Sequence, residues 1–144
     1  MGAGWTNAEE ISILQWYFGG TAKTPPASTF VALLTAEPND DGTFAEIAYQ
    51  NYARQEIAAA QWAVPSGGDP TSMANAVALT YPVAGAAGPA TATYWGLMTL
   101  VSAGLILFSG KINVPSGGLP ISEGIQPQFA TGALILQLGD LPQP

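Results

Sequence analysis

Apolar side chains recur at helical spacing near the start of the chain. Ile11, Leu14 and Phe18 follow one another at steps of three and four residues, which places them on one face of a helix. Gly19 and Gly20 come next, and glycine permits the left-handed residue at which many helices end. The pattern therefore predicts an N-terminal helix over residues 6–20.

The two ends of this helix carry further signals. Thr6 and Glu9 stand three residues apart, as in a capping box that closes the first turn. Trp16 and Tyr17 widen the apolar face. Because so broad an apolar face needs cover, we expect the helix to dock on the rest of the protein.

Short apolar and β-branched runs, separated by Gly, Pro and Asn, fill the rest of the chain. The run at 29–35 and the two runs flanking Ser102, Ala103 and Gly104 are apolar at nearly every position, so we expect them to be buried on both faces of a sheet. One helix followed by many short strands is typical of a mainly β fold, an antiparallel, jelly-roll-like β-sandwich. We expect a single domain over residues 1–144 with the sandwich at 29–138, and strands at 29–35, 51–62, 75–81, 91–100, 105–112 and 131–138.

The segment at 113–128 is rich in turn-forming residues and has no long apolar run. A loop of this length in a compact domain is usually functional or held by a partner. It is therefore a candidate arm that reaches a neighbouring subunit. Its apolar side chains would make the contact: Val114, Pro115, Leu119, Ile121 and Ile125.

Charge is scarce in this sequence. Three Lys and Arg stand against ten Asp and Glu, a net charge of −7, which argues against partners that are nucleic acids or anionic membranes. Charged residues make up 9% of the chain, whereas about 25% is usual. Because interface cores are poor in charge, the composition favours a homo-oligomer, although a low-charge monomer would share it.

The termini and apolar runs predict neither a signal peptide nor a membrane span. No basic residue precedes an apolar run at the N-terminus. The longest apolar stretch, 97–108, is far shorter than the ~20 residues that a membrane helix needs. We therefore expect synthesis in the cytoplasm.

The residue types that carry most enzyme chemistry are missing. The chain has no His and no Cys, which removes the usual general base and the thiol nucleophile. Paired carboxylates of a glycosidase would have to come from Glu37, Glu46, Glu56 or Glu123, and no spacing sets two of them apart. We predict that the protein is not an enzyme.

The acidic segment at 36–46 partly fits a calcium-binding loop. Glu37, Asn39 and Asp41 occupy the first, third and fifth positions of that template. Its twelfth position, normally a bidentate Glu, is Ala48. We prefer an Asx-type turn between strands, with calcium as the weaker alternative, and expect no cofactor.

Arg54 is the only arginine and lies within the predicted strand at 51–62. A guanidinium keeps its charge when buried, so it needs carboxylate or carbonyl partners. Glu46 and Glu56 are the nearest carboxylates in sequence. We predict a structural ion pair, with a pair across a subunit interface as the second interpretation.

The aromatic residues suggest mostly core packing. Trp16, Tyr17 and Trp95 lie within predicted elements. Trp5 and Trp62 are the candidates for partly exposed rings, which a glycan-binding module would use.

Several fragments together resemble a group of small structural proteins of tailed bacteriophages, commonly labelled phage tail fibre proteins. The resemblance spans about 14–138, and its most specific part is Tyr-Ala-Arg-Gln with the closing Phe and Gly-Ala-Leu. The matching fragments are LQWYFGGT, TFVALLTAEP, NYARQEI, TYWGL, LILFSGKI and the spacing GxxPxFxxGAL.

The resemblance implies a non-enzymatic virion component that assembles as a symmetric oligomer, with a trimer favoured. We favour a position on the capsid, where the protein would be a decoration or cement protein that binds the major capsid protein. The reason is that the sequence has no long heptad run and no shaft repeat. The alternatives are a tail fibre or baseplate component, or a host-surface glycan-binding module.

Overall fold

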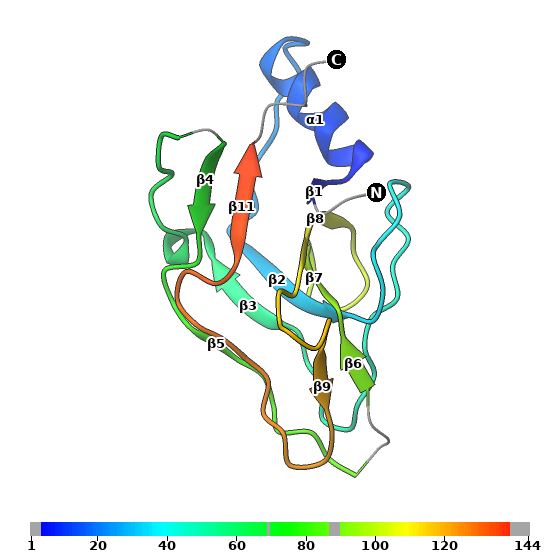
Figure 1. Cartoon of the computed structure of the whole chain (residues 1–144). Coiled ribbons are helices and arrows are strands. Elements are labelled where there is room, and N and C mark those ends of the chain that lie inside the picture. Colours follow the sequence, from blue (N-terminus) through cyan, green and yellow to red (C-terminus); the bar gives the residue numbers. More distant parts are fainter. Residues whose placement is uncertain (1–3, 69, 87–89, 139–144) are drawn as a thin grey trace.

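The computed structural model describes residues 4–68, 70–86 and 90–138 and has antiparallel strand pairing throughout. Its main element is a five-stranded sheet (Figure 1). In spatial order the strands are β1 (Gly4–Trp5), β8 (Ile106–Lys111), β7 (Tyr94–Met98), β2 (Ser28–Leu34) and β3 (Gln55–Ala58).

Three two-stranded ribbons accompany this sheet. They form because segments distant in sequence pair over only two to four residues each. The ribbons are β4 (Thr71–Ala74) with β11 (Ile135–Leu138), β5 (Leu79–Thr80) with β10 (Gln128–Phe129), and β6 (Ala90–Ala92) with β9 (Leu119–Ile121); a 3-10 turn, η1 (Ala59–Gln61), follows β3.

The five-stranded sheet is buried on both faces. Alternate residues of β2 enter different clusters: Val31 and Leu33 join the larger one, whereas Ala32 and Leu34 join the smaller. The larger cluster also holds residues of the ribbons, so sheet and ribbons pack as a two-layered, sandwich-like body. The expected mainly β fold with one helix is confirmed, and so is the burial of β2, β7 and β8.

The N-terminal helix differs from expectation at its first turn. α1 covers Asn7–Tyr17, but Thr6 does not cap it through its side chain. The Oγ1 of Thr6 donates instead to the carbonyl of Ile106, at 3.0 Å. The predicted capping box is therefore wrong, because the buried hydroxyl pairs with β8 and not with the helix.

The docking predicted for the helix is also wrong. α1 buries none of its residues and stands at one end of the molecule, while β6 and β9 lie at the other (Figure 1). Gly20 has a φ of +67°, the left-handed conformation that we expected of the glycine after the helix, and the chain turns there. No helix in the described ranges is long and apolar enough to cross a membrane.

The segment at 113–128 is folded onto its own body and does not extend as an arm. Ile121 is buried in the larger cluster, and Val114 and Leu119 pack against it. Ile125, by contrast, is 42% exposed, and Pro115 is exposed as well. The expected extended conformation is wrong because Leu119 and Ile121 complete the core through β9. Contact between this segment and a neighbour stays a prediction.

Candidate functional site

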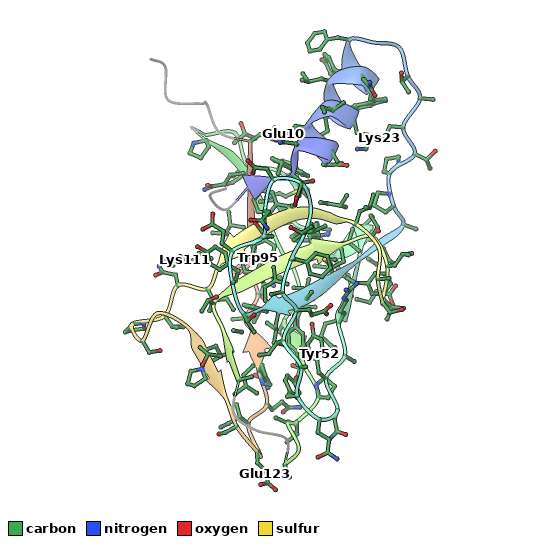
Figure 2. The ribbon with its side chains drawn as sticks, turned by 90° about the vertical axis from the view of Figure 1, so that its right-hand side faces the viewer. Glu10, Lys23, Tyr52, Trp95, Lys111 and Glu123 are labelled. Carbon is green, nitrogen blue, oxygen red and sulfur yellow. The ribbon has the colours of Figure 1, made fainter. Side chains whose placement is uncertain are left out.

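The sheet holds α1 at its N-terminal end. The backbone N–H of Thr6 donates to the carbonyl of Leu107 at 3.1 Å, beside the hydroxyl contact to Ile106. One residue earlier, the Trp5 ring packs edge-on against Phe108 with centroids 5.1 Å apart. The start of α1 is thus fixed to β8, and the rest of the helix projects beyond the sheet (Figure 2).

An apolar cavity of about 380 Å³ lies between α1 and the sheet. Ile13 and Trp16 line it from the helix, and Leu97 and Leu107 line it from the sheet. Glu9 and Lys23 also line it and form an ion pair with each other. The remaining lining residues are Trp5, Pro25, Pro26, Thr29, Ala59, Trp62, Met73 and Leu136. We call this space the α1 cavity.

The far side of the helix carries a second apolar surface. Ile11, Leu14 and Phe18 are 55%, 57% and 80% exposed, and their spacing places them in one stripe, here called the outer stripe. At about 100° of rotation per residue, this stripe lies roughly opposite Ile13 and Trp16. The helix is therefore apolar on two opposed sides, which is unusual for a helix at the surface of a monomer.

The exposed aromatic surface of α1 is large. Trp16, Tyr17 and Phe18 are 51%, 72% and 80% exposed, and their rings follow one another edge to face. At about 200 Å² per aromatic side chain, their exposed parts amount to roughly 400 Å². Three side chains thus supply as much as the largest apolar patch of a typical monomer, roughly 300–600 Å². Such a patch marks an interaction surface.

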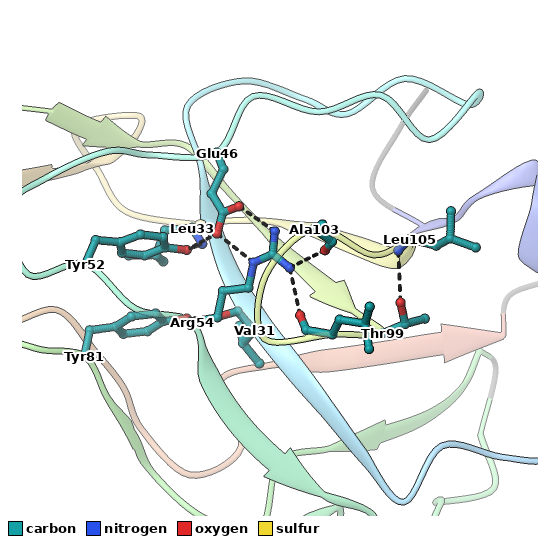
Figure 3. Close-up of polar contacts among 10 residues, drawn as sticks. Val31, Leu33, Glu46, Tyr52, Arg54, Tyr81, Thr99, Ala103 and Leu105 are labelled. Atoms are coloured by element: carbon teal, nitrogen blue, oxygen red, sulfur yellow. Dashed lines mark hydrogen bonds and ion pairs between the residues drawn. The ribbon is translucent and has the colours of Figure 1, made fainter.

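Arg54 lies in a fully formed hydrogen-bond network beside the turn between β7 and β8 (Figure 3). Its Nε and Nη2 donate to the two oxygens of Glu46, at 2.8 and 2.6 Å. Its Nη1 donates to the carbonyls of Leu100 and Ala103, at 2.8 and 2.6 Å. The guanidinium therefore joins Glu46 to the turn, and Glu56 is not among its partners.

Tyr52 extends the network, although sequence reasoning did not include it. Its hydroxyl donates to Glu46 at 2.7 Å and accepts the N–H of Leu33 at 3.0 Å. The hydrogen bonds that Arg54 donates to Glu46 raise the pKa of Arg54. Burial, with the hydrogen bond to the same carboxylate, raises the pKa of Tyr52. Tyr52 stands two residues before Arg54, on the motif YARQ, which was the available signal.

The structure places the aromatic side chains partly as expected and partly not. Trp5 and Trp62 are half-buried, and both line the α1 cavity. Trp16 and Tyr17, expected in the core, are exposed instead. The missed signal was that apolar residues occur on both sides of the predicted helix, so a single docking face could not cover them all.

The acidic segment forms a turn. The carboxylate of Asp41 accepts the backbone N–H and the hydroxyl of Thr43, at 2.9 and 2.7 Å, and these bonds lower its pKa. The amide of Asn39 also donates to Thr43, while Glu37 accepts from the hydroxyl of Tyr94. Asn39 and Asp41 thus share Thr43 as a partner, whereas Glu37 pairs with Tyr94. The described ranges contain no group of three His, Cys, Asp or Glu side chains placed to hold a metal.

Comparison with known proteins identifies the family. No curated protein matches the sequence. A family model described as "Gp80: Podophage GP4 fiber I protein gp80" matches residues 4–137, nearly the whole chain and all of the fold and surfaces described above. The chain therefore belongs to the podophage GP4 fiber I protein gp80 family, a family of phage fibre proteins.

Proposed function

We propose that the protein is a non-enzymatic structural subunit of a phage virion fibre, and that it forms a homo-oligomer through the outer stripe of α1. The apolar surface of that helix is the observation that carries the proposal. Ile11, Leu14 and Phe18 lie on it without cover, and α1 buries no residue of its own. An exposed stripe of this kind is what a helix offers to a second helix.

The magnitude of the apolar surface supports self-assembly. Ile11, Leu14 and Phe18 are 55%, 57% and 80% exposed. Full burial of such a side chain is worth about 1.5–3 kcal/mol, so covering these three in two copies is worth roughly 6–12 kcal/mol before costs. Association costs about 4–15 kcal/mol in lost freedom. The gain is of the same order as this cost, so burial of the outer stripe supplies a large share of the free energy that an oligomer needs.

A trimer is the oligomer that we favour. Ile11 and Phe18 face away from the α1 cavity, and Tyr17 extends the apolar surface to one side. A helix with so wide an exposed surface is covered better by two neighbouring helices than by one. A three-fold ring is the smallest assembly that gives each helix two neighbours.

Two placements on the particle compete. The family supports a fibre attached to the tail. The absence of a long heptad run or shaft repeat from the sequence favours instead the capsid decoration role. A decoration protein would cement the lattice by binding only its assembled form. In either place we propose that the partners are virion proteins and that no metal or cofactor takes part.

Antibody labelling of intact particles tests the placement. Gold-labelled antibody against the purified protein is expected at the tail. Label over the faces of the head would overturn the fibre placement in favour of decoration. Particles that lack both the label and the chain in mass spectrometry would overturn the virion role itself.

Light scattering after size exclusion tests the assembly. Wild-type protein is expected at a multiple of its 14.8 kDa chain mass, with three chains favoured. Replacing both Leu14 and Phe18 with Ser is expected to give monomers with an unchanged circular dichroism spectrum. Val64→Ser is the matched control, because Val64 is 89% exposed and lies outside α1. A wild-type monomer, or a double variant that keeps the wild-type mass, would refute the role of the outer stripe.

A further inference from the structure

A second cavity, of about 260 Å³, lies where β8 ends and shares no lining residue with the α1 cavity. Trp95 of β7 forms one side, and Lys111, Asn113 and Val114 follow β8 along another. Phe129 of β10 closes the third. Figure 2 shows Trp95 within the sheet and Lys111 at its edge. We call this space the Trp95 cavity.

Trp95 brings an unpaired donor to this cavity. The residue is 3% exposed and packs against Phe108 with ring centroids 5.6 Å apart. Among the described residues no acceptor pairs with its Nε1, and the one fully buried side-chain atom without a partner there is Ser109 Oγ. The indole N–H is therefore left for an acceptor outside the described residues, and its ring lines the Trp95 cavity.

Glycine at position 110 sets the direction of this donor. A Cβ on Gly110 would lie 2.4 Å from the Nε1, Cε2 and Cζ2 atoms of Trp95, so only glycine admits the ring there. The N–H edge of the indole thus rests on the backbone at Gly110, next to the wall formed by Lys111 and Asn113. Close packing on Gly110 holds the indole in place before any ligand arrives.

The opposite wall is also fixed. Phe129 packs edge-on against the buried Tyr81, with centroids 6.1 Å apart. The amide of Asn75 donates to the carbonyl of Ala130 at 2.9 Å and accepts the N–H of Leu134 at 2.8 Å. A rigid wall lowers the entropy cost of binding, so the cavity is preorganised for a ligand.

The chemistry of the lining selects the ligand. The exposed amides of Asn113 and Gln128 supply both donors and acceptors, while Val114 and Leu119 are apolar. No carboxylate lines the Trp95 cavity. A ligand that matches needs an acceptor for the indole N–H, hydroxyls for the amides, an apolar ring face and a small apolar group. The volume lies below the roughly 300–1,000 Å³ of sites for drug-sized ligands, which limits the ligand to about one ring.

We propose that the Trp95 cavity binds one sugar unit that carries an acetamido group. Its carbonyl accepts from Trp95 Nε1, its methyl group contacts Val114 and Leu119, and its hydroxyls pair with Asn113 and Gln128. The ring face lies on Phe129, as sugar rings lie on aromatic side chains. This site is separate from α1, so the proposal stands or falls independently of assembly.

Nuclear magnetic resonance of ¹⁵N-labelled protein tests the site. The probe is methyl 2-acetamido-2-deoxy-β-D-glucopyranoside, titrated to a few tens of millimolar. The indole N–H signal of Trp95 is expected to shift with millimolar affinity, while those of Trp5, Trp16 and Trp62 stay in place. A Trp95 signal that does not move over this range would overturn the proposal.

Variants and related probes sharpen the test. Trp95→Phe removes the donor together with its indole signal, so binding to this variant is followed by the side-chain amide signals of Asn113 and Gln128. Asn113→Ala removes an exposed amide without touching the core. Each change is expected to weaken binding about tenfold, as loss of one hydrogen bond does. Trp62→Phe lies outside the cavity and is the matched control. Wild-type affinity in Asn113→Ala would contradict the site.

Two further probes separate the sources of the acetamido group. Methyl β-D-glucopyranoside lacks it and is expected to bind more weakly; equal affinity would overturn the acetamido assignment. N-acetylglycine methylamide has the amide without the sugar. A larger Trp95 shift with this peptide-like probe would overturn the sugar in favour of a protein segment.

Discussion

At the scale of single residues, Arg54 explains how a low-charge protein accepts a buried cation. Its side chain is 4% exposed, and it makes four hydrogen bonds to Glu46, Leu100 and Ala103. One planar donor thus joins Glu46 to two carbonyls of the turn between β7 and β8. Lysine carries one ammonium group on a flexible chain and lacks the planar set of donors of a guanidinium, so it cannot replace Arg54 here.

Arg54→Met is expected to destabilise the monomer. The change leaves Glu46, 23% exposed, without its cation and removes both bonds to the turn, at a cost of about 2–4 kcal/mol. For a chain of this size that lowers Tm by about 5–15 °C. Thermal unfolding followed by circular dichroism measures the shift.

Two control variants separate the loss of the Arg54 contacts from the loss of a positive charge alone. Lys111→Met removes an exposed cation, and its Tm should equal that of the wild type. Arg54→Lys should fall between the two, because it keeps the charge and loses the two-pronged contact with Glu46. If Arg54→Met melts at the wild-type temperature, the network does not stabilise the fold.

At the scale of elements, the sequence predicts best what continuous apolar runs encode. β2, β7 and β8 stand at the predicted places because nearly every residue in them is apolar and buried on one face or the other. β1, β9 and β10 were missed, since pairs of two or three residues carry no periodicity to detect. Their register depends on partners far away in the chain.

The run at 51–62 shows a second limit of sequence reasoning. Only Gln55–Ala58 forms a strand, β3, and η1 follows at once. Gln61 ends the strand locally, because its side chain accepts the N–H of Ala58 at 2.8 Å. Such a side-chain contact competes with strand pairing and leaves no mark in a hydrophobic pattern.

Asn75 connects β4 and β5 to the turn before β11, and its loss should loosen all three. Asn75→Ala leaves the carbonyls of Val77 and Ala130 and the N–H of Leu134 without their partner, at about 2–4 kcal/mol. Chemical denaturation should show a lower midpoint. Asn113→Ala, an exposed amide, is the control; equal midpoints for the two variants would contradict this role.

Alkaline pH should unfold the protein through its buried tyrosines. Burial raises the pKa of Tyr52 and of Tyr81, which donate to Glu46 and to the carbonyl of Val31. The unfolded chain titrates near the ordinary value of 10.0, so their stabilisation is complete below that pH and is lost as pH rises above it. The slope should approach about 1.4 kcal/mol per pH unit for each buried tyrosine.

Substitutions identify the groups responsible for the alkaline transition. Tyr52→Phe should make the loss of stability above pH 10 shallower, because one buried phenol no longer titrates. Tyr17→Phe alters an exposed ring and should leave the slope unchanged. Denaturant midpoints measured at several pH values give both slopes, and identical slopes for Tyr52→Phe and wild type would contradict the assignment.

At the scale of the whole molecule, the candidate sites were only partly within reach of the sequence. The Arg54 pair with Glu46 follows from the rule that a buried charge needs a partner, and both residues stand close in sequence. The Trp95 cavity joins β7, β8 and β10, whose meeting depends on the complete fold. The exposed stripe of α1 was visible as a pattern, but only the structure shows that none of the described segments covers it.

Net charge gives a prediction for the assembled protein. Each copy carries −7, so copies that meet through the apolar stripe of α1 repel one another. Raising the salt concentration from about 0.01 to about 0.15 M shortens the screening length from about 30 to about 8 Å. We therefore expect self-association to tighten by about tenfold over this range. Sedimentation equilibrium at the two concentrations measures it.

Substitution of two carboxylates tests where on the molecule the repulsion between copies arises. Glu10 lies on α1, whereas Glu123 lies at the opposite tip of the molecule (Figure 2). Glu10→Gln should tighten association at low salt and flatten its salt dependence, because it removes a charge beside the outer stripe. Glu123→Gln should behave like the wild type, since its charge is far from that surface. Association that weakens with salt would instead mean that ion pairs hold the copies together, and would remove the apolar stripe as the cause of assembly.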